Sequence, residues 1–408
     1  MSAVAGLRGT GDWGTDERPK NFRELILFRN PNGSAPLFAL AAKIASDSVD
    51  DPEFNWWDEP NDLVRIQFDA AFASGVTSLT CDSADPSASA PGIPYGNATH
   101  LKPGDLLMLE DASEAAVFTH EIMQVATVTS ATAFTVVRGV AGSTAIAIVN
   151  DDFALKIGSA YAEGTLSPDA TSRNPIKYSN FAQIFKNAYE LTGTILKTRA
   201  RTGKVLDNDK KRKTFDHSRD IELALMFGQK FETTGANGKP LRFMGGLREF
   251  ISTATTTIFG SSVTLTQYLD ATTPLFDWDS PAGDERIAFC GNGYMNTLNL
   301  LANSNGQVRF GDVIDVYGMK LREFILPQGR IFLRSHPLMN RHAQYKDSAF
   351  IIDMSSLRWR PLRDTKSMDN IQANDADTIK GQWLTEAGLE VTRGGLTCGY
   401  HGNFNSVA

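Results

Sequence analysis

The stretch Leu106–Val140, LLMLEDASEAAVFTHEIMQVATVTSATAFTVVRGV, has the pattern of short β-strands joined by tight turns. Runs of β-branched and aromatic residues are interrupted by Asp-Ala-Ser-Glu and Ser-Ala-Thr, as between hairpin strands. A turn, Lys102-Pro-Gly-Asp105, precedes the first run. Apolar side chains for one small core come from Ile122, Val125, Val128, Phe134, Val136 and Val140. The sequence therefore predicts a barrel or sandwich of about five strands at about residues 75–157.

The charge of this module argues against a nucleic-acid-binding barrel. Such a barrel needs basic and stacking residues on one face, whereas this stretch carries Glu110, Asp111, Glu114 and Glu121. The flanking segments, 60–74 and 158–200, have the pattern of two sides of one long extended arm. This layout favours a building block over a catalyst.

Composition sets the outer limits. A chain of 408 residues with 42% hydrophobic and 21% charged residues is typical of folded soluble protein with two or three domains. The formal net charge of −7, from 40 Lys plus Arg against 47 Asp plus Glu, argues against a dedicated nucleic-acid binder.

Cysteine usage and hydropathy indicate where the chain folds. Cys81, Cys290 and Cys398 lack the paired spacing of a zinc site or a disulfide framework, which predicts folding in a reduced, intracellular compartment. The apolar segment Ala35–Ala45 is too short to cross a bilayer and contains Lys43. No signal-peptide pattern opens the sequence, so we expect no membrane partner.

Residues 1–60 are rich in Gly and Pro and predict an extended arm with one or two short helices, near 21–29 and 36–45. The arm carries Phe22, Phe28, Trp56 and Trp57 without an evident core of its own. Exposed aromatic clusters of this size promote association. These side chains must therefore be covered either by another part of the chain or by a neighbouring subunit, and both possibilities stay open.

A long helix is predicted at Asp207–Phe231, with Asp207 or Asn208 as its N-cap and Gly235–Gly238 as its end. Residues at three- and four-residue spacing form one buried stripe, namely Phe215, Ser218, Ile221, Leu225 and Gly228. At about 1.5 Å per residue the helix runs over about 30 Å and can serve as the axis of a domain.

The C-terminal half predicts two further units. Strands at 286–289, 313–317, 320–325 and 329–333, with a helix after Gly291, indicate an α/β domain of about a hundred residues. Strand runs between 349 and 404 predict an antiparallel sheet that the Asp207 helix covers. The fold class is thus α+β.

Candidate chemical sites favour structural interpretations. His336 and His342 are six residues apart, with Pro337 between them, which fits no common helical metal site. Gly291-Asn-Gly293 lacks the rest of a phosphate-binding fingerprint and reads as a tight strand-to-helix turn. The paired acids, among them Asp277 and Asp279, lie in loop-like sequence. We predict no catalytic, cofactor-binding or metal-binding residue and no enzymatic activity.

The basic run Lys210–Lys213 at the start of the long helix allows two interpretations. It could contact nucleic acid, but a solvated face or an intersubunit ion pair with acidic neighbours is the commoner role for so short a run.

The order of these parts resembles one family. The resemblance rests on three segments in this order: the aromatic arm, the interrupted extended loop and the long helix. It also rests on four short motifs: Tyr178-Ser-Asn-Phe-Ala-Gln-Ile-Phe185, Leu191-Thr-Gly-Thr194, Gly245-Gly-Leu-Arg-Glu-Phe-Ile251 and Phe289-Cys-Gly-Asn-Gly-Tyr-Met-Asn296. The chain resembles the major capsid proteins of tailed double-stranded DNA phages, of the Hong Kong 97 type with a β-domain inserted in the extended loop.

The resemblance implies a division of the chain. Residues 1–60 would be the N-arm, 61–180 the extended loop with its insert, 181–245 with 345–408 the peripheral domain around the spine helix, and 246–344 the axial domain. It also implies assembly as hexamers and pentamers into an icosahedral shell around DNA. We name Phe22, Phe28, Trp56, Trp57, Lys177 and Tyr178 as candidate assembly contacts.

The resemblance also sets expectations about partners. The chain shows no charged helical scaffolding segment, so we expect a separate scaffold protein, with a portal, a decoration protein and loosely contacted DNA as further partners. Lys177 lies where some relatives are crosslinked, but we predict no crosslink. The expected location is the virion capsid, assembled in the host cytoplasm. Another phage structural part, such as a tail or decoration protein, and a soluble α/β enzyme remain as alternatives.

Overall fold

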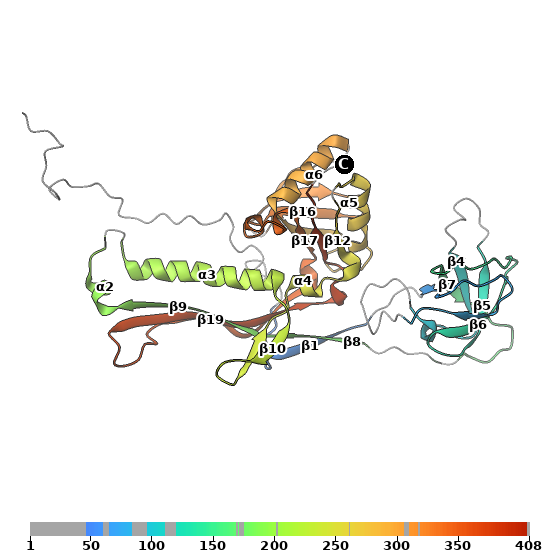
Figure 1. Ribbon diagram of the computed structural model, residues 1–408, viewed down its shortest axis with the longest axis horizontal. Helices are drawn as coiled ribbons and strands as arrows, with labels where there is room; N and C mark the ends of the chain where they lie inside the picture. Colours follow the sequence, from blue (N-terminus) through green and yellow to red (C-terminus); the bar gives the residue numbers. More distant parts are fainter. Residues whose placement is uncertain are drawn as a thin grey trace, which may run out of the picture.

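The computed structural model describes residues 46–59, 65–83, 96–110, 120–168, 170, 175–200, 203–260, 262–305, 310–316 and 319–405. Its main body consists of a long helix lying along a three-stranded sheet, joined to a seven-stranded sheet with its own helices (Figure 1). A two-stranded ribbon leads from this body to a separate β-domain (Figure 1). The α+β class is confirmed.

The β-domain is a six-stranded antiparallel sheet that closes on itself. Its strands are β2 (Arg65–Gln67), β3 (Ser78–Thr80), β4 (Asp105–Glu110), β5 (Ile122–Val128), β6 (Ala133–Val137) and β7 (Phe153–Ser159). Their order is β2-β7-β4-β5-β6-β3. An antiparallel bridge between Phe68 and Cys81, just beyond β2 and β3, joins the first strand to the last. The predicted barrel is therefore confirmed, and alternate strand residues fill its core.

One detail of the predicted insert was wrong. The barrel has six strands, in line with the prediction of about five, but it begins at β2, ten residues before the expected boundary at 75. Ile66 and Phe68 are fully buried in the barrel core, so this segment is held by the insert and not by the body. Three residues are too short a run to show alternation in the sequence, which is why β2 was missed.

The ribbon consists of β1 (Glu53–Asp58) and β8 (Ile176–Phe181), paired antiparallel from Glu53 opposite Phe181 to Asp58 opposite Ile176. The expected return of the chain as a strand after residue 174 is confirmed. The expected boundary between the N-arm and the loop at 60 stays a prediction; β1 on the arm side of it pairs with β8, which comes from the end of the loop.

The long helix, α3 (Val205–Phe227), covers a three-stranded sheet of β18 (Leu357–Met368), β19 (Thr378–Val391) and β9 (Gln183–Thr192). Ile221 and Leu225 are buried as predicted, but His217, Glu222 and Met226 complete the stripe. Phe215 and Ser218 are only half-buried. The predicted cover of the C-terminal sheet by this helix is thus confirmed, and a short helix, α2 (Gly193–Lys197), follows β9.

The predicted limits of the long helix, 207 and 231, were wrong. Lys204 is the N-cap, without a side-chain cap bond, and Gly228 is the C-cap. A Cβ on Gly228 would lie 2.6 Å from the Ala224 carbonyl oxygen, and a Cβ on Gly246 would lie 2.6 Å from the same atom. The helix ends there because two glycine backbones pass against its last turn. Gly235–Gly238 instead turns the hairpin of β10 (Phe231–Thr234) and β11 (Pro240–Phe243).

The seven-stranded sheet has the order β12-β20-β17-β13-β16-β15-β14. The strands are β12 (Thr256–Ile258), β13 (Glu285–Cys290), β14 (Phe310–Val316), β15 (Met319–Ile325), β16 (Arg330–Ser335), β17 (Ala349–Ile352) and β20 (Gly399–Gly402). Three helices accompany it, namely α4 (Leu247–Phe250), α5 (Leu265–Thr272) and α6 (Asn292–Asn305). Single 3-10 turns lie at Ala98–His100, Thr253–Thr255, Thr273–Leu275, Met339–Arg341, Tyr345–Asp347, Met354–Ser356 and Arg393–Gly395.

This sheet is buried on both faces. Ala288 and Cys290 of β13 pack in the cluster that contains α5 and α6, whereas Ile287 and Phe289 pack in the cluster that contains α3. A strand that is covered on both sides reads as a continuous apolar run. The α3 cluster also contains Phe185 and Leu389 of the three-stranded sheet, so one core joins the two sheets.

The assignment of all of 345–408 to the domain of the long helix was wrong. β17 pairs with β13, and β20 lies between β17 and β12, so both are strands of the seven-stranded sheet. All four residues of each strand are buried. The C-terminal segment therefore contributes strands to both sheets.

Candidate assembly surfaces

The β1–β8 ribbon has one face against the body. Phe54 and Trp56 are 7% and 6% exposed, and Trp56 packs on Tyr178 and Phe250 with ring centroids 6.0 and 5.6 Å away. Trp56 and Tyr178 are opposite each other in the ribbon. The aromatic residues of the arm were expected to be buried either by another part of the chain or by a neighbouring subunit. Trp56 is buried by other parts of this chain.

The other face of the ribbon is open. Trp57 is 60% exposed and stands opposite Lys177, which is also exposed. Adjacent residues of a strand point to opposite faces, so the Trp56-Trp57 pair has one ring inside and one outside. Phe22 and Phe28 lie outside the described residues. An assembly role for Trp57, Lys177 and the half-buried Tyr178 stays a prediction.

Asp58, the last residue of β1, anchors the ribbon on a turn of the body. Its Oδ2 accepts a hydrogen bond of 2.7 Å from the main-chain N–H of Gly394. Arg393, Gly394 and Gly395 all have positive φ angles, of 59°, 55° and 69°, a conformation that turns successive N–H groups towards an anion. Burial raises the pKa of the Asp58 carboxyl. The hydrogen bond from the Gly394 N–H and the charge of Arg393 lower this pKa, but by less than burial raises it.

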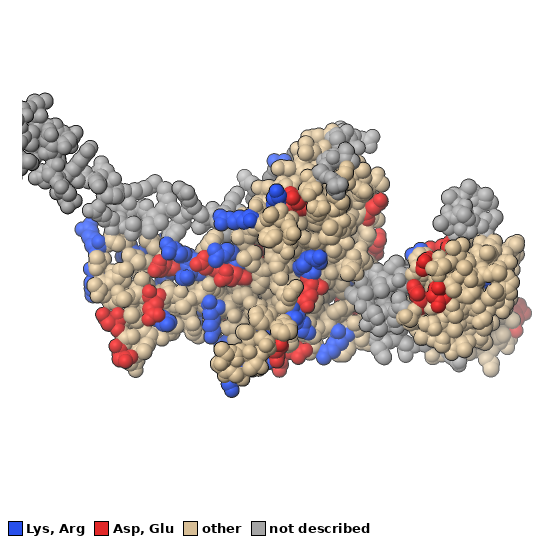
Figure 2. Space-filling model, viewed as in Figure 1, with Lys and Arg blue, Asp and Glu red and all other residues tan. Residues whose placement is uncertain are grey.

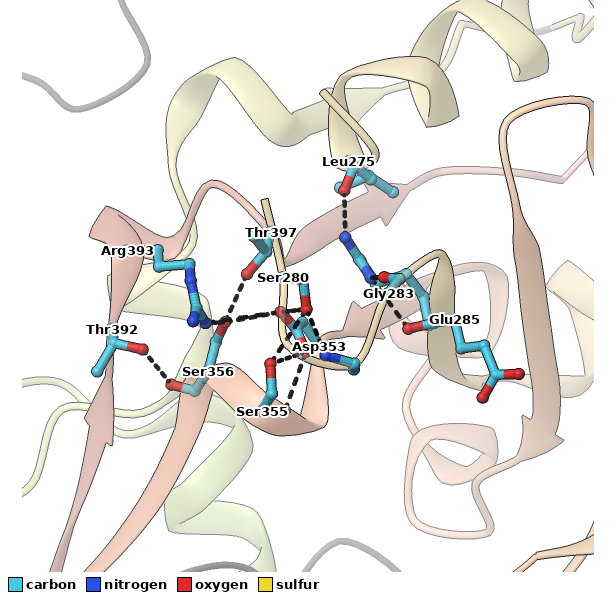
Figure 3. A network of polar contacts seen from close by, with 12 residues as sticks. Leu275, Ser280, Gly283, Glu285, Asp353, Ser355, Ser356, Thr392, Arg393 and Thr397 are labelled. Carbon is cyan, nitrogen blue, oxygen red and sulfur yellow. Dashed lines mark hydrogen bonds and ion pairs between the residues drawn. The ribbon is translucent and has the colours of Figure 1, made fainter. Parts of the chain in front are cut away.

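A polar network fixes that turn (Figure 3). Arg393 donates to the Ser356 hydroxyl at 2.8 Å, and Ser356 donates to Asp353 at the same distance. The fully buried Asp353 also accepts from Ser280 and Ser355, both at 2.7 Å. These hydroxyl bonds outweigh burial and lower the pKa of Asp353. The ribbon therefore docks on a rigid part of the body.

The chain before the ribbon runs along the outer edge of β18. The main-chain N–H groups of Asp47 and Val49 donate to the carbonyl oxygens of Trp359 and Pro361, at 3.3 and 3.0 Å. The Asp47 carboxylate pairs with Arg358 at 2.9 Å and with Arg360 at 3.3 Å. The first described residues of the arm thus cover a strand edge that would otherwise be open to pairing.

The β10–β11 hairpin exposes apolar side chains. Phe231, Leu241 and Phe243 are 60%, 46% and 38% exposed, and the hairpin forms a largely uncharged projection in Figure 2. Sequence reasoning missed it by reading Gly235–Gly238 as a helix end. The signal was present, because Asn-Gly between Phe-Glu-Thr-Thr and Pro-Leu-Arg-Phe is the pattern of a hairpin turn.

The surface of α3 has mixed charge, with blue and red side by side in Figure 2. Lys210 lies 3.1 Å from Asp369, Arg212 lies 3.8 Å from Asp209, and Lys213 lies 3.8 Å from Asp216. Lys210, Arg212 and Lys213 thus pair with acidic residues of the same chain; the intersubunit ion pair and the nucleic-acid contact considered for the run both stay predictions.

The structure shows the contacts of the residues considered for chemistry. His336 is fully buried and lies 2.7 Å from the buried Glu222 of α3, whereas His342 stacks on Tyr345. Gly291 forms the predicted strand-to-helix turn, since a Cβ there would collide with the backbone of Lys346. Across the described part of the chain, no three His, Cys, Asp or Glu residues are grouped to hold a metal. No helix among those residues is long and apolar enough to cross a membrane.

One buried histidine is held neutral in the α5–α6 core. His401 of β20 is fully buried, and its Nδ1 lies 2.9 Å from the Tyr294 hydroxyl. Burial lowers the pKa of His401 to about 4, although the Ala271 carbonyl opposes the shift. This group makes the larger sheet sensitive to acid.

Comparison with known proteins identifies the chain's relatives. The major capsid protein of Pseudomonas phage PaMx41 is 28% identical over 366 residues, which are 88% of this chain and 82% of that protein. Among solved structures, the capsid of an empty GTA particle matches at 8% identity, with 96% coverage of both chains and a TM-score of 0.47. The structure of Mycobacterium phage Adephagia is 9% identical, with 96% coverage of both chains and a TM-score of 0.43.

The family follows from the sequence match. Along the chain, the described elements form a ribbon, an inserted barrel, a long helix on a three-stranded sheet, and a second sheet with its own helices. The model of the SU10 major capsid protein family matches residues 9–395. The chain therefore belongs to the SU10 major capsid protein family.

Proposed function

We propose that this phage capsid protein assembles as hexamers and pentamers into a closed icosahedral shell around double-stranded DNA. The seven-stranded sheet with α5 and α6 would be the axial domain, at the centre of each capsomer. The three-stranded sheet with α3 would be the peripheral domain. This division keeps the two expected domains but moves β17 and β20 to the axial one.

One observation carries the proposal: two thin two-stranded elements at the margin of a well-filled body, the ribbon and the β10–β11 hairpin, expose large apolar side chains. Trp57 and Phe231 are each 60% exposed, on the ribbon and on the hairpin. Each square ångström of apolar surface that a neighbour covers contributes about 25 cal/mol before the cost of association. Many such contacts in a closed symmetric shell give strong assembly without one strong site.

The membership of a structural family supports a role without catalysis. Expected partners are a scaffold protein, a portal, a decoration protein and packaged DNA. A net charge of −7 suits a wall that contains DNA without gripping it. The product would reside in the virion after assembly in the host cytoplasm.

The test is assembly with a co-expressed scaffold protein. Particles hundreds of ångströms across, seen by electron microscopy and by sedimentation, are the expected result. A protein that remains a monomer or small oligomer under these conditions would contradict the proposal.

A deletion of residues 1–45 tests the arm. It leaves the Asp47–Arg358 pair and the whole ribbon in place, so the subunit should fold normally. We expect closed shells to be lost, and normal shells from the truncated chain would reject an assembly role for the arm.

A further inference from the structure

We propose that the β10–β11 hairpin is a docking arm whose apolar face seats on the acidic tip of the β18–β19 hairpin, residues 368–377, of a second copy of this chain. The inference rests on the proposed shell assembly and specifies one contact within it. It is argued from the faces of the hairpin, from its mounting, and from the chemistry of the tip.

The two faces of the hairpin differ. Phe231 pairs with Phe243 and Thr233 with Leu241, so these four side chains share one face, with the two phenyl rings 6.4 Å apart. Glu232 and Arg242 pair on the opposite face and form an ion pair of 2.8 Å. One face is thus apolar and open to solvent, whereas the charges on the other face are paired with each other.

The hairpin needs a cover. Among the described residues, β10 and β11 form a sheet of their own, and all four residues of β10 are exposed. An isolated two-stranded sheet is marginally stable in water, and an apolar face gains stability when another surface packs on it. The contact is therefore expected to rigidify the hairpin as well as to bind.

The base of the hairpin is held firmly. The Lys230 N–H donates to Glu249 at 2.6 Å, and the Met244 N–H donates to Gln183 at 2.9 Å. The buried Asn180 side chain donates to the carbonyl oxygens of Gly245 and Leu389, at 3.0 and 2.6 Å. The apolar face is presented at a fixed place on the body.

The tip of the β18–β19 hairpin offers complementary chemistry. Met368 and Ile371 there are 39% and 38% exposed. Asp375 and Asp377 are exposed, Asp369 already pairs with Lys210, and the sequence from 367 to 379 contains no Lys or Arg. The docking hairpin has the opposite balance, because Lys230 and Lys239 remain after Arg242 has paired with Glu232. When two apolar patches are flanked by residues of opposite charge, the charges favour one alignment of the two surfaces over others.

The two surfaces are different parts of the subunit, so the contact is heterologous. Such a contact closes into a ring when the rotation between copies closes. A chain that assembles in many identical copies meets this partner at the highest concentration. This favours a second copy as the occupant over any protein that is present in few copies.

Site-specific photo-crosslinking tests the occupant. The full-length chain with p-benzoylphenylalanine at Leu241 is prepared in normal and ¹⁵N-labelled form, mixed, assembled with scaffold protein and irradiated. Crosslinks of mixed isotope content that fall within 364–380 are expected. Crosslinks that never have mixed isotope content would show a contact within one chain, for example with residues 1–45. That result, crosslinks to the scaffold protein, or crosslinks to other regions of a second copy would each overturn the proposal.

Substitutions test the energetics. Phe231→Ser should lower the yield of shells at least tenfold, and Ile371→Ser should do the same, while thermal unfolding of the isolated subunit changes little. The double variant should lose little more than either single one, because both remove the same contact. Val149→Ser, at a site 62% exposed in the barrel, is the matched control. Shells at wild-type yield from Phe231→Ser would refute the hairpin contact, and additive losses would refute its pairing with the tip.

The design separates this inference from the shell proposal. If the wild-type chain forms no shells, the proposed function fails and the variants have no meaning. If the wild type forms shells and both hairpin and tip variants do so equally well, shell assembly stands and this contact is wrong.

Discussion

The inserted barrel and the seven-stranded sheet of the body are both β-structures with filled cores, but they complete themselves in different ways. The barrel closes within residues 65–159, through the Phe68–Cys81 bridge. The body sheet is completed by β20, at Gly399–Gly402, whose partner β12 lies at Thr256–Ile258. The barrel is therefore a local unit, whereas the body depends on contacts between distant parts of the chain, which form later and at higher entropic cost.

The largest expected effect comes from deletion of residues 399–408. β12 pairs with β20, so the deletion removes the strand between β12 and β17 as well as the buried His401 and Phe404. The amide groups of the body should lose their protection from hydrogen exchange, while those of the barrel should keep it because the barrel stays folded. Hydrogen exchange read separately for 65–159 and for the body checks this, and protection that persists throughout the body would contradict it.

The converse test is Glu121→Gln in the barrel. Arg138 and Glu121 are 5% and 0% exposed, and two bonds of 2.5 and 2.6 Å join them. Removing one partner of such a pair costs about 3–5 kcal/mol because the other charge is left buried and unpaired. The barrel should unfold at lower denaturant concentration while the body transition is unchanged. A shift of both transitions would show that the two units do not fold independently.

The ribbon between the two units allows a matched pair of substitutions. Trp56→Ala should destabilise the body by about 3 kcal/mol, since it empties a site packed on Tyr178 and Phe250. Trp57→Ala should change the stability of the isolated subunit by less than about 0.5 kcal/mol and reduce shell yield instead. Chemical denaturation and sedimentation measure the two effects. Equal losses of stability would contradict the inward and outward assignment.

A smaller effect is acid sensitivity in the body. The pKa of His401 is lowered by burial to about 4, so the unfolded chain binds a proton between its ordinary pKa of about 6.5 and this value while the folded chain does not. The stability from this group is present above pH 6.5 and is lost as the pH falls towards 4. Between pH 6.5 and 4.5 the loss should be about 2 kcal/mol.

His401→Gln provides the control for this pH dependence, since it removes the titrating group and keeps a polar side chain near Tyr294. The variant should lose less stability than the wild type over the same pH range, in denaturant titrations that follow the body transition. Parallel pH profiles would mean that other groups account for the acid sensitivity.

Much of this architecture is predictable from local patterns. Alternating apolar residues in Leu106–Val140 predict the barrel, and spacing of three and four residues at Ile221 and Leu225 predicts the long helix. The assignment to a capsid family rests on the order of these parts. Local patterns predict the ends of helices and the positions of short strands less well. The Gly228 terminus depends on a close approach of Gly246, which is remote in sequence.

The candidate assembly surfaces divide in the same way. The sequence identifies Trp56 and Trp57 as aromatic residues that need a cover, but both have the same local context. Phe250 and Tyr178, brought to one side of the ribbon by the fold, decide that Trp56 is buried and Trp57 is exposed. The hairpin carrying Phe231 was hidden because its turn also fits the end of a helix.

The sequence by itself determined the α+β class, the inserted barrel, the spine helix and the family, because these depend on periodicity and order along the chain. Only the tertiary structure decided that β17 and β20 enter the larger sheet and which apolar side chains remain outside. The physical reason is that the burial of a side chain depends on which distant segments of the chain pack against it. The residues next to it in the sequence do not determine those contacts.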